Sequence, residues 1–442
     1  MSRDAHAFIA AARFGYGARP GELARIGRDP RGWLVDQLRP DVAPPRQLAS
    51  LPSGHSIIEE ELHFRGDPEA RKRFNRERVA PLFRDEVAQR TRAATESDTP
   101  FRERLVRFWS NHFTVSALAN RSRPVVGAFE REAIRPHVVG RFRDMLGAVV
   151  KHPAMLIYLD NVASVGPNSP RGFRSGRGLN ENLVREIMEL HTLGVDGGYT
   201  QADVTEFACI LTGWSIADLK FATPGAFAYR YDLHEPGPKR LLGRTYDQGG
   251  EEEGEAALDM LARHPATARH VVRKLARHFV ADDPPDAAIE RLRRAFVETD
   301  GDLGMLARTL VDLPDVWREP FAKVKSPDDL TVSTWRLIGP PEQPGPLLAP
   351  LRLLAQIPFT APSPAGWPDT AADWVAPETM VHRIQLADLI ARRAARRFDP
   401  RTLAEDALGP VASETTLRAI RQAASAREAL ALLLASPEFQ RR

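Results

Sequence analysis

The sequence predicts an all-α protein: a large multi-helix, bundle-like body with one small β-hairpin. Capped segments with apolar residues at helical spacing run from residue 99 to the C-terminus. Alternating apolar and polar residues followed by a turn, the pattern of a hairpin, occur near 227–246. The chain has 442 residues, of which 43% are hydrophobic, so we expect one large buried core.

The whole chain, 1–442, is expected to form one helical body. Its softer subdivisions are N-terminal helices at 1–98, a motif-bearing core at 99–218, a hairpin insert at 219–250 and C-terminal helices at 251–442. The helix from Pro100 illustrates the signals, because Thr99 is a suitable N-cap and proline is favoured at the first helical position. Phe101, Leu105 and Phe108 then share one face.

Composition excludes several classes of protein. The net charge is only +3 and charges of both signs are interleaved, so no nucleic-acid surface is predicted. No stretch is long and apolar enough for a membrane span. The single cysteine, Cys209, excludes an internal disulfide and is expected to be a buried, inert thiol. No signal peptide precedes the first helices, so the expected location is the cytoplasm.

The stretch from residue 178 to 214 carries the densest group of chemically capable side chains and predicts helix, glycine turn, helix. Asn180 is the expected N-cap and Gly194 the left-handed stop of the first helix. Thr200 and Asp203 have the spacing of a capping box that starts the second helix.

At about 100° per residue, Asn182, Glu186 and Glu189 fall on one side of the helix at 180–193. His191 lies roughly opposite Glu189, which argues against these two residues as one ligand pair. Two carboxylates one turn apart could hold a divalent metal together with a histidine from another helix. The alternative is a polar helix side whose carboxylates are neutralised by Arg185.

One functional hypothesis is therefore a metal-dependent enzyme. Carboxylates and imidazoles from helices 101–113 and 180–193 would meet in a pocket roofed by the Gly/Ser/Pro/Arg-rich loop at 160–178. His112 ends an apolar stripe and is expected to face the core near the central helix. The candidate catalytic residues are Glu186, Glu189, His191 and His112, and the candidate cofactor-binding residues are Asn180, Asn182, Arg185 and Asp160.

Seven strings of the sequence resemble the bacterial family catalogued as domain of unknown function 1800. They are FWSNHFTVS (108–116), EREAIRPHVVGRF (130–142), HPAMLIYLDN (152–161), GLNENLVREIMELHTLGVDGGYTQADV (178–204), LTGW (211–214), HPATARHVVRKLARHFVADDPP (264–285) and GWPD (366–369). The resemblance covers nearly the whole chain and implies a predominantly helical fold. It implies no established activity, catalytic residue or cofactor.

The resemblance also suggests a second hypothesis, a non-catalytic binding or assembly protein. Members of the family are often encoded beside proteins of domain of unknown function 1501, many of which look exported, so a protein of that family is the candidate partner. Some relatives carry export signals that this sequence lacks, which leaves export together with a partner open. In this hypothesis the polar helix at 180–193 is an internal hydrogen-bond network.

Overall fold

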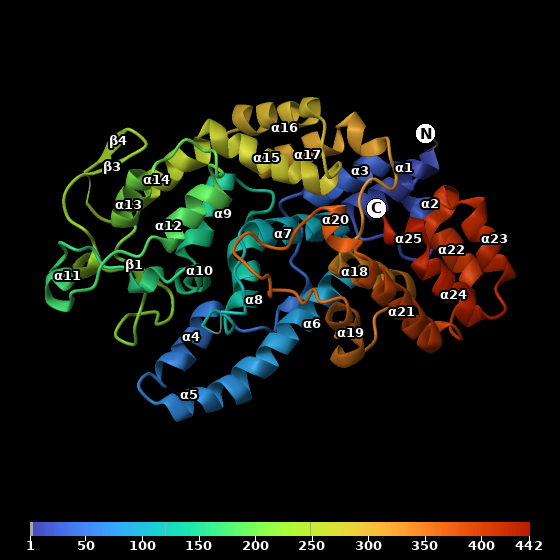
Figure 1. Ribbon diagram of the computed structural model, residues 1–442, viewed down its shortest axis with the longest axis horizontal. Coiled ribbons are helices and arrows are strands. Elements are labelled where there is room, and N and C mark those ends of the chain that lie inside the picture. Colours follow the sequence, from blue (N-terminus) through green and yellow to red (C-terminus); the bar gives the residue numbers. More distant parts are fainter. Residues whose placement is uncertain (1–2, 120, 248) are drawn as a thin grey trace.

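A computed structural model of the chain describes residues 3–119, 121–247 and 249–442. It shows an elongated body built almost entirely of helices, which confirms the all-α prediction (Figure 1). Within the described residues, no helix is both long and apolar enough to cross a membrane. The division into four stretches stays a prediction, because the helices pack as a continuous series along the body.

The first helices, α1 to α3, lie beside the C-terminal helices at the right of Figure 1, and α4 to α6 form a projecting arm below the body. Here η marks a 3-10 or π turn. The elements are α1 (Arg3–Ile9), η1 (Ala10–Phe14), α2 (Glu22–Ile26), α3 (Pro30–Val35), η2 (Asp36–Leu38), η3 (Arg46–Leu48), α4 (Gly54–Leu62), α5 (Pro68–Phe74), η4 (Asn75–Val79) and α6 (Ala80–Glu96).

The middle of the chain supplies the centre of the body. Its elements are α7 (Pro100–His112), α8 (Val126–Phe129), η5 (Glu130–Ile134), η6 (Arg135–His137), α9 (Phe142–Lys151), α10 (Pro153–Tyr158), η7 (Asn161–Ala163), α11 (Pro170–Ser175), α12 (Asn182–Glu186), η8 (Ile187–His191) and α13 (Gln201–Ile210). The predicted capping box at Thr200 and Asp203 is confirmed, with both hydrogen bonds present.

The strand region contains two short antiparallel pairs where we expected one hairpin. β1 (Trp214–Ile216) pairs with β2 (Phe227–Tyr229), and β3 (Lys239–Leu241) pairs with β4 (Arg244–Tyr246), with η9 (Tyr231–Leu233) between the pairs. Leu242 and Gly243 join β3 to β4, and both have positive φ, as a two-residue I′ turn requires. The sequence pattern missed this turn because leucine is unusual at such a position.

The C-terminal part completes the top and the far end of the body. Its elements are α14 (Glu251–Arg263), α15 (Pro265–Phe279), α16 (Asp286–Glu298), α17 (Leu303–Val311), η10 (Pro314–Trp317), α18 (Pro327–Ile338), α19 (Pro344–Leu353), α20 (Ala371–Trp374), α21 (Pro377–Ala394), α22 (Pro400–Leu408), η11 (Gly409–Val411), α23 (Glu414–Gln422), α24 (Ala426–Ala435) and α25 (Pro437–Gln440). Ser326 caps α18 by accepting the N–H of Asp329.

Two large clusters of buried apolar side chains make up the interior. The larger cluster draws on residues 7–317 and includes α7 and α15. The second cluster draws mainly on residues 330–439, from α18 to α25, together with a few side chains of α1 and α6. Helices α7 and α15 therefore lie on one side of a seam between the clusters, and α18 lies on the other.

Close packing of α14 on β1 gives a test of this arrangement. A Cβ added at Gly254 would lie 2.2 Å from Cζ2 of the fully buried Trp214. Gly254→Ala should therefore destabilise the protein by about 1–3 kcal/mol, because the indole has no free space to move into. Thermal unfolding would measure the loss. The control is Gly178→Ala, where the added methyl group meets open space and the melting temperature should stay unchanged.

Candidate functional site

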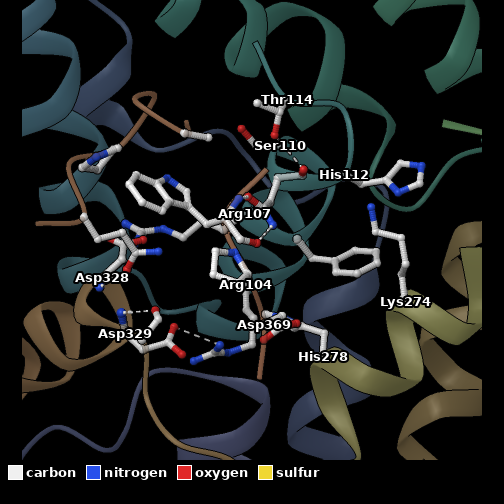
Figure 2. A pocket seen from close by; sticks show the side chains of 18 of the residues that line it. Arg104, Arg107, Ser110, His112, Thr114, Lys274, His278, Asp328, Asp329 and Asp369 are labelled. Atoms are coloured by element: carbon white, nitrogen blue, oxygen red, sulfur yellow. Dashed lines mark hydrogen bonds and ion pairs between the residues drawn. The ribbon is translucent and has the colours of Figure 1, made fainter. Parts of the chain in front are cut away.

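A cavity of about 330 Å³ lies at the seam between the two apolar clusters, and we call it the seam pocket (Figure 2). Its walls come from α7, α15, the start of α18 and the irregular segment 356–373. The polar and charged side chains that line it are Tyr16, Arg90, Arg104, Arg107, Ser110, Asn111, His112, Thr114, Lys274, Arg277, His278, Ser326, Asp328, Asp329, Gln356, Asp369, Thr370 and Asp373.

Segment 356–373 is fastened to the end of α7 by paired hydrogen bonds. The Asn111 side chain accepts the N–H of Trp367 at 2.8 Å and donates to its carbonyl at 2.9 Å. Gly366 has a φ of 86°, and a Cβ there would lie 2.5 Å from the Asn111 carbonyl oxygen. Only glycine allows this close approach without strain, so the local sequence fixes where the next residues stand.

The residue that follows this anchor by two positions, Asp369, completes a histidine–carboxylate pair. His278 Nδ1 lies 2.6 Å from Asp369 Oδ2, and the two side chains point toward each other in Figure 2. A carboxylate can only accept, so Nδ1–H donates and Nε2 carries the lone pair of the neutral ring. Nε2 is buried and has no hydrogen-bond partner within the described part of the chain.

Burial and the neighbouring charges keep the His278 imidazole neutral and the Asp369 carboxyl ionised. Burial lowers the pKa of His278, and the Asp369 carboxylate opposes that shift without reversing it. Burial works against ionisation of Asp369, yet His278, Lys323 and Arg442 together hold its pKa below the ordinary value. At neutral pH the pair is therefore a neutral imidazole oriented by a carboxylate, the arrangement of a general base.

Lys274 stands one helical turn before His278 on α15 and reaches the same pocket. No ion pair or hydrogen bond satisfies its ammonium group among the described residues. Burial lowers its pKa to about 8, with Asp369 opposing the shift and Arg277 adding to it. His270, one turn earlier again, donates Nε2–H to the Leu190 carbonyl at 2.9 Å and so joins α15 to η8.

Three of the four arginines that line the pocket, Arg90, Arg104 and Arg107, are paired with two aspartates of α18. Asp329 forms ion pairs of 3.0 Å with both Arg104 and Arg442. Asp328 pairs with Arg107 and, at 3.5 Å, with Arg90. These contacts cross the seam and hold α18 against α7.

Tyr16 adds an unpaired hydroxyl to the same region. Its ring is fully buried beneath the Arg104 guanidinium, whose central carbon lies 4.3 Å from the ring centroid. The hydroxyl has no partner among the described residues, and burial raises its pKa to about 12. It is an unsatisfied hydrogen-bond donor on a residue that lines the pocket.

Of the residues that the sequence singled out, His112 lines the seam pocket. It is buried, and its Nε2–H donates to the His191 carbonyl at 3.0 Å, which confirms the predicted position against the core and the central helix. Burial, followed by the charge of Lys274, holds its pKa well below the ordinary value. Nδ1 is left without a partner in the described structure.

His191 and the two candidate carboxylates lie on different sides of the central helix. The His191 ring is fully buried beside Phe113, and burial lowers its pKa to about 3. Glu186 and Glu189 are half-buried on the other side and make no ion pair or hydrogen bond among the described residues. Burial and the charge of Glu189 raise the pKa of Glu186.

The remaining candidates serve the local structure of the helix. Asn180 accepts the N–H of Asn182 at 2.9 Å, and the Asn182 side chain is exposed. Arg185 bonds Glu181 and Gln201, each at 3.0 Å, so it does not neutralise the carboxylate pair as the alternative interpretation required. These bonds tie α12 to α13.

The loop at 160–178 does not cover the seam pocket, and its role as a lid over the central helix stays a prediction. Among the described residues, those that line the seam pocket include none from the loop at 160–178. That loop contains η7 and α11 and borders a separate groove against α4 and α5. Asp160 pairs with Arg121 at 3.0 Å near that groove. The low apolar content of the loop predicted its exposure. The composition of the loop could not predict that it would lie opposite α4 and α5.

The predicted metal constellation also does not assemble. The described part of the chain holds no group of three or more His, Cys, Asp or Glu side chains placed to bind one ion. Cys209 is half-buried where we expected full burial, and desolvation raises its pKa to about 12, which keeps the thiol protonated.

Sequence reasoning missed Lys274, His278 and Asp369 as site residues. A signal was present, because His270, Lys274 and His278 recur every four residues and therefore share one face of a helix. Asp369 had no comparable local signal, since it lies in an irregular segment whose partner is 91 residues away.

Removing Asp329 should lower the free energy of unfolding, because buried arginines would lose their counter-ion. Asp329→Ala leaves Arg104 and Arg442 unpaired and should destabilise the protein by about 3–5 kcal/mol. Asp388→Ala, which removes an exposed carboxylate paired with Arg392 and Arg427, should change the melting temperature little. Denaturant unfolding of both variants makes the comparison, and equal losses would contradict it.

The same substitution should alter acid stability. Burial disfavours the charged form of Asp329, but Arg104 and Arg442 hold its pKa below the ordinary value of 3.8. Its contribution to stability is fully present above that value and is lost as the pH falls toward the lower folded-state pKa. Unfolding free energy should therefore depend less on pH below about 4 in Asp329→Ala than in the wild type.

One known family matches the chain, while other comparisons find no match. The chain matches no curated protein and no solved structure. A family model described as "Protein of unknown function (DUF1800)" matches residues 9–441, nearly the whole chain. Residues from three of the strings that carry the resemblance line the seam pocket. These strings are FWSNHFTVS, the string at 264–285 that contains α15, and GWPD. The chain therefore belongs to the DUF1800 family.

Proposed function

We propose that the seam pocket is an enzyme active site in which the His278–Asp369 pair moves a proton. The observation that carries the proposal is the unpaired Nε2 of His278, which is buried at the pocket while Nδ1 is held by Asp369 at 2.6 Å. Buried polar atoms are normally satisfied, so an unpaired one on a side chain that lines a pocket supports a bound molecule as its partner.

The reaction class is general acid–base chemistry on a small bound molecule. No Ser, Thr or Cys of the described chain bonds Nε2, so the pair lacks the nucleophile of a catalytic triad. Nε2 would accept a proton from the substrate or from a water molecule, and Asp369 would stabilise the imidazolium that forms. The Tyr16 hydroxyl would donate a hydrogen bond to the same ligand.

His278 should react with diethyl pyrocarbonate, which acylates neutral imidazole, and peptide mass spectrometry would locate the product. Because burial lowers the pKa of His278, its reaction should persist as the pH is lowered toward 6. Exposed His63 is the positive control, and His191, which is fully buried away from the pocket, should stay unmodified. An unreactive His278 would contradict an accessible base.

Activity provides the second arm of this test. The wild type and His278→Asn would be incubated in D₂O with a mixture of small metabolites, and NMR would follow exchanged or lost C–H signals. Loss of a general base should slow turnover by about 10²–10⁴-fold. Turnover that is equal in the two proteins would count against the proposed role of His278.

A divalent metal held by Glu186 and Glu189 alone, without a histidine ligand, is a second candidate function. It is supported by Glu186 and Glu189, which lie half-buried, one turn apart and without a cationic partner in the described chain. His191 does not support this site, because its ring is buried on the side of the helix that faces Lys274 and His270. The hydrogen bonds of Arg185 to Gln201 and of Thr205 to Glu181 support the alternative in which the polar helix is an internal structural network. In that alternative the protein is a binding or assembly protein, and a domain of unknown function 1501 protein is the candidate partner.

Glu189→Gln separates these two interpretations. The protein should stay folded with an unchanged or slightly raised melting temperature, because the substitution removes repulsion from Glu186 and breaks no ion pair. Divalent metal that copurifies with the wild type should be lost if these carboxylates bind it. Elemental analysis alongside thermal unfolding measures both quantities, and a variant that unfolds would favour the structural network.

A further inference from the structure

We infer that the Lys274 end of the seam pocket binds the anionic group, a carboxylate or a phosphate, of a small-molecule substrate. This inference rests on the proposed function, because it names the kind of molecule whose proton the His278–Asp369 pair would move. The two residues lie four positions apart on α15 and open into one cavity (Figure 2).

The Lys274 end of the pocket differs from the rest because its positive charge has no paired carboxylate in the described structure. Arg90, Arg104 and Arg107 are each paired with an aspartate of α18. The Lys274 ammonium group has no carboxylate within ion-pair distance among the described residues, and Asp369 already serves His278 and Lys323. Lys274 is half-buried, and burial disfavours its charged form, so an anionic ligand beside the ammonium group would stabilise it.

The other titratable groups around Lys274 also favour an anionic ligand at this end of the pocket. His112 of α7, His191 of η8 and His270 of α15 all lie near enough for the Lys274 charge to act on their titration. Arg277 adds a second positive charge on the same helix, and Asp369 is the carboxylate that opposes them. His112 also lines the cavity, and its buried Nδ1 has no hydrogen-bond partner in the described structure.

Geometry limits the ligand further. A volume of about 330 Å³ is near the lower end for small-molecule sites, so the ligand is a small metabolite. Side chains four residues apart on a helix begin about 5–6 Å apart. Lys274 and His278 therefore line neighbouring stretches of the cavity wall, so one small ligand can contact both.

Anion binding at this end should weaken as the pH rises. Lys274 is charged below its pKa, which burial lowers to about 8, and loses its charge above it. The surrounding imidazoles have pKa values lowered by burial and stay neutral in this range, so they do not replace the lost charge.

Competitive acetylation of the whole protein with trace acetic anhydride, read by peptide mass spectrometry, tests the inference. Inorganic phosphate in one arm, or acetate in the other, should slow labelling of Lys274 severalfold at constant ionic strength. Exposed Lys220 and buried Lys239, which is ion-paired with Glu253 at 2.8 Å, are internal controls whose rates should not change. Protection in one arm alone identifies phosphate or carboxylate as the recognised group, and protection in neither arm overturns the inference.

Matched variants separate this inference from the proposed function. Phosphate or acetate should raise the melting temperature of the wild type and of Lys220→Met but not of Lys274→Met. An equal rise in Lys274→Met overturns the inference, and if that variant fails to fold, the labelling experiment on the wild type decides. His278→Asn should keep the protection of Lys274, so a failed base and a failed anion site give different results.

Discussion

The structure depends on the ion pairs of Asp329 with Arg104 and Arg442. These three buried side chains come from α18, from α7 and from the second residue after α25, and they meet where the two apolar clusters adjoin. A buried carboxylate is tolerated only with close cationic partners, so the contact fixes the relative position of the helices that carry it. Apolar packing alone would let the clusters slide, because it has little directional preference.

The pocket is a consequence of this polar seam. Charged side chains with fixed pairing geometry cannot interdigitate as apolar ones do, and the space left between α7, α15 and α18 is lined by their polar ends. Segment 356–373 closes that space because Asn111 and Gly366 hold it against α7. The general-base pair is thus assembled from a rigid helix and an anchored segment, which favours precise positioning of a reactive group.

Local signals predicted the helices better than they predicted the site. Caps at Thr200 and Ser326 and the apolar stripe that ends at His112 were readable because each depends on neighbours within a few residues. The partnership of His278 with Asp369 depends on how a long irregular segment crosses the seam, and no periodicity encodes that. The second strand pair was missed for a similar reason, since the I′ turn at Leu242 and Gly243 lacks its usual residues.

Helix geometry explains why the expected metal ligands do not meet at the central helix. At about 100° per residue, His191 lies close around the axis to the buried Ile187, four positions earlier, and roughly opposite Glu189. Residues Ile187–His191 form a π turn, in which Thr192 Oγ1 also donates to the Ile187 carbonyl at 2.6 Å, and His191 stays on the buried face in this turn. The imidazole therefore lies beside His112 in the interior, while Glu186 and Glu189 remain half-buried on another side of the helix.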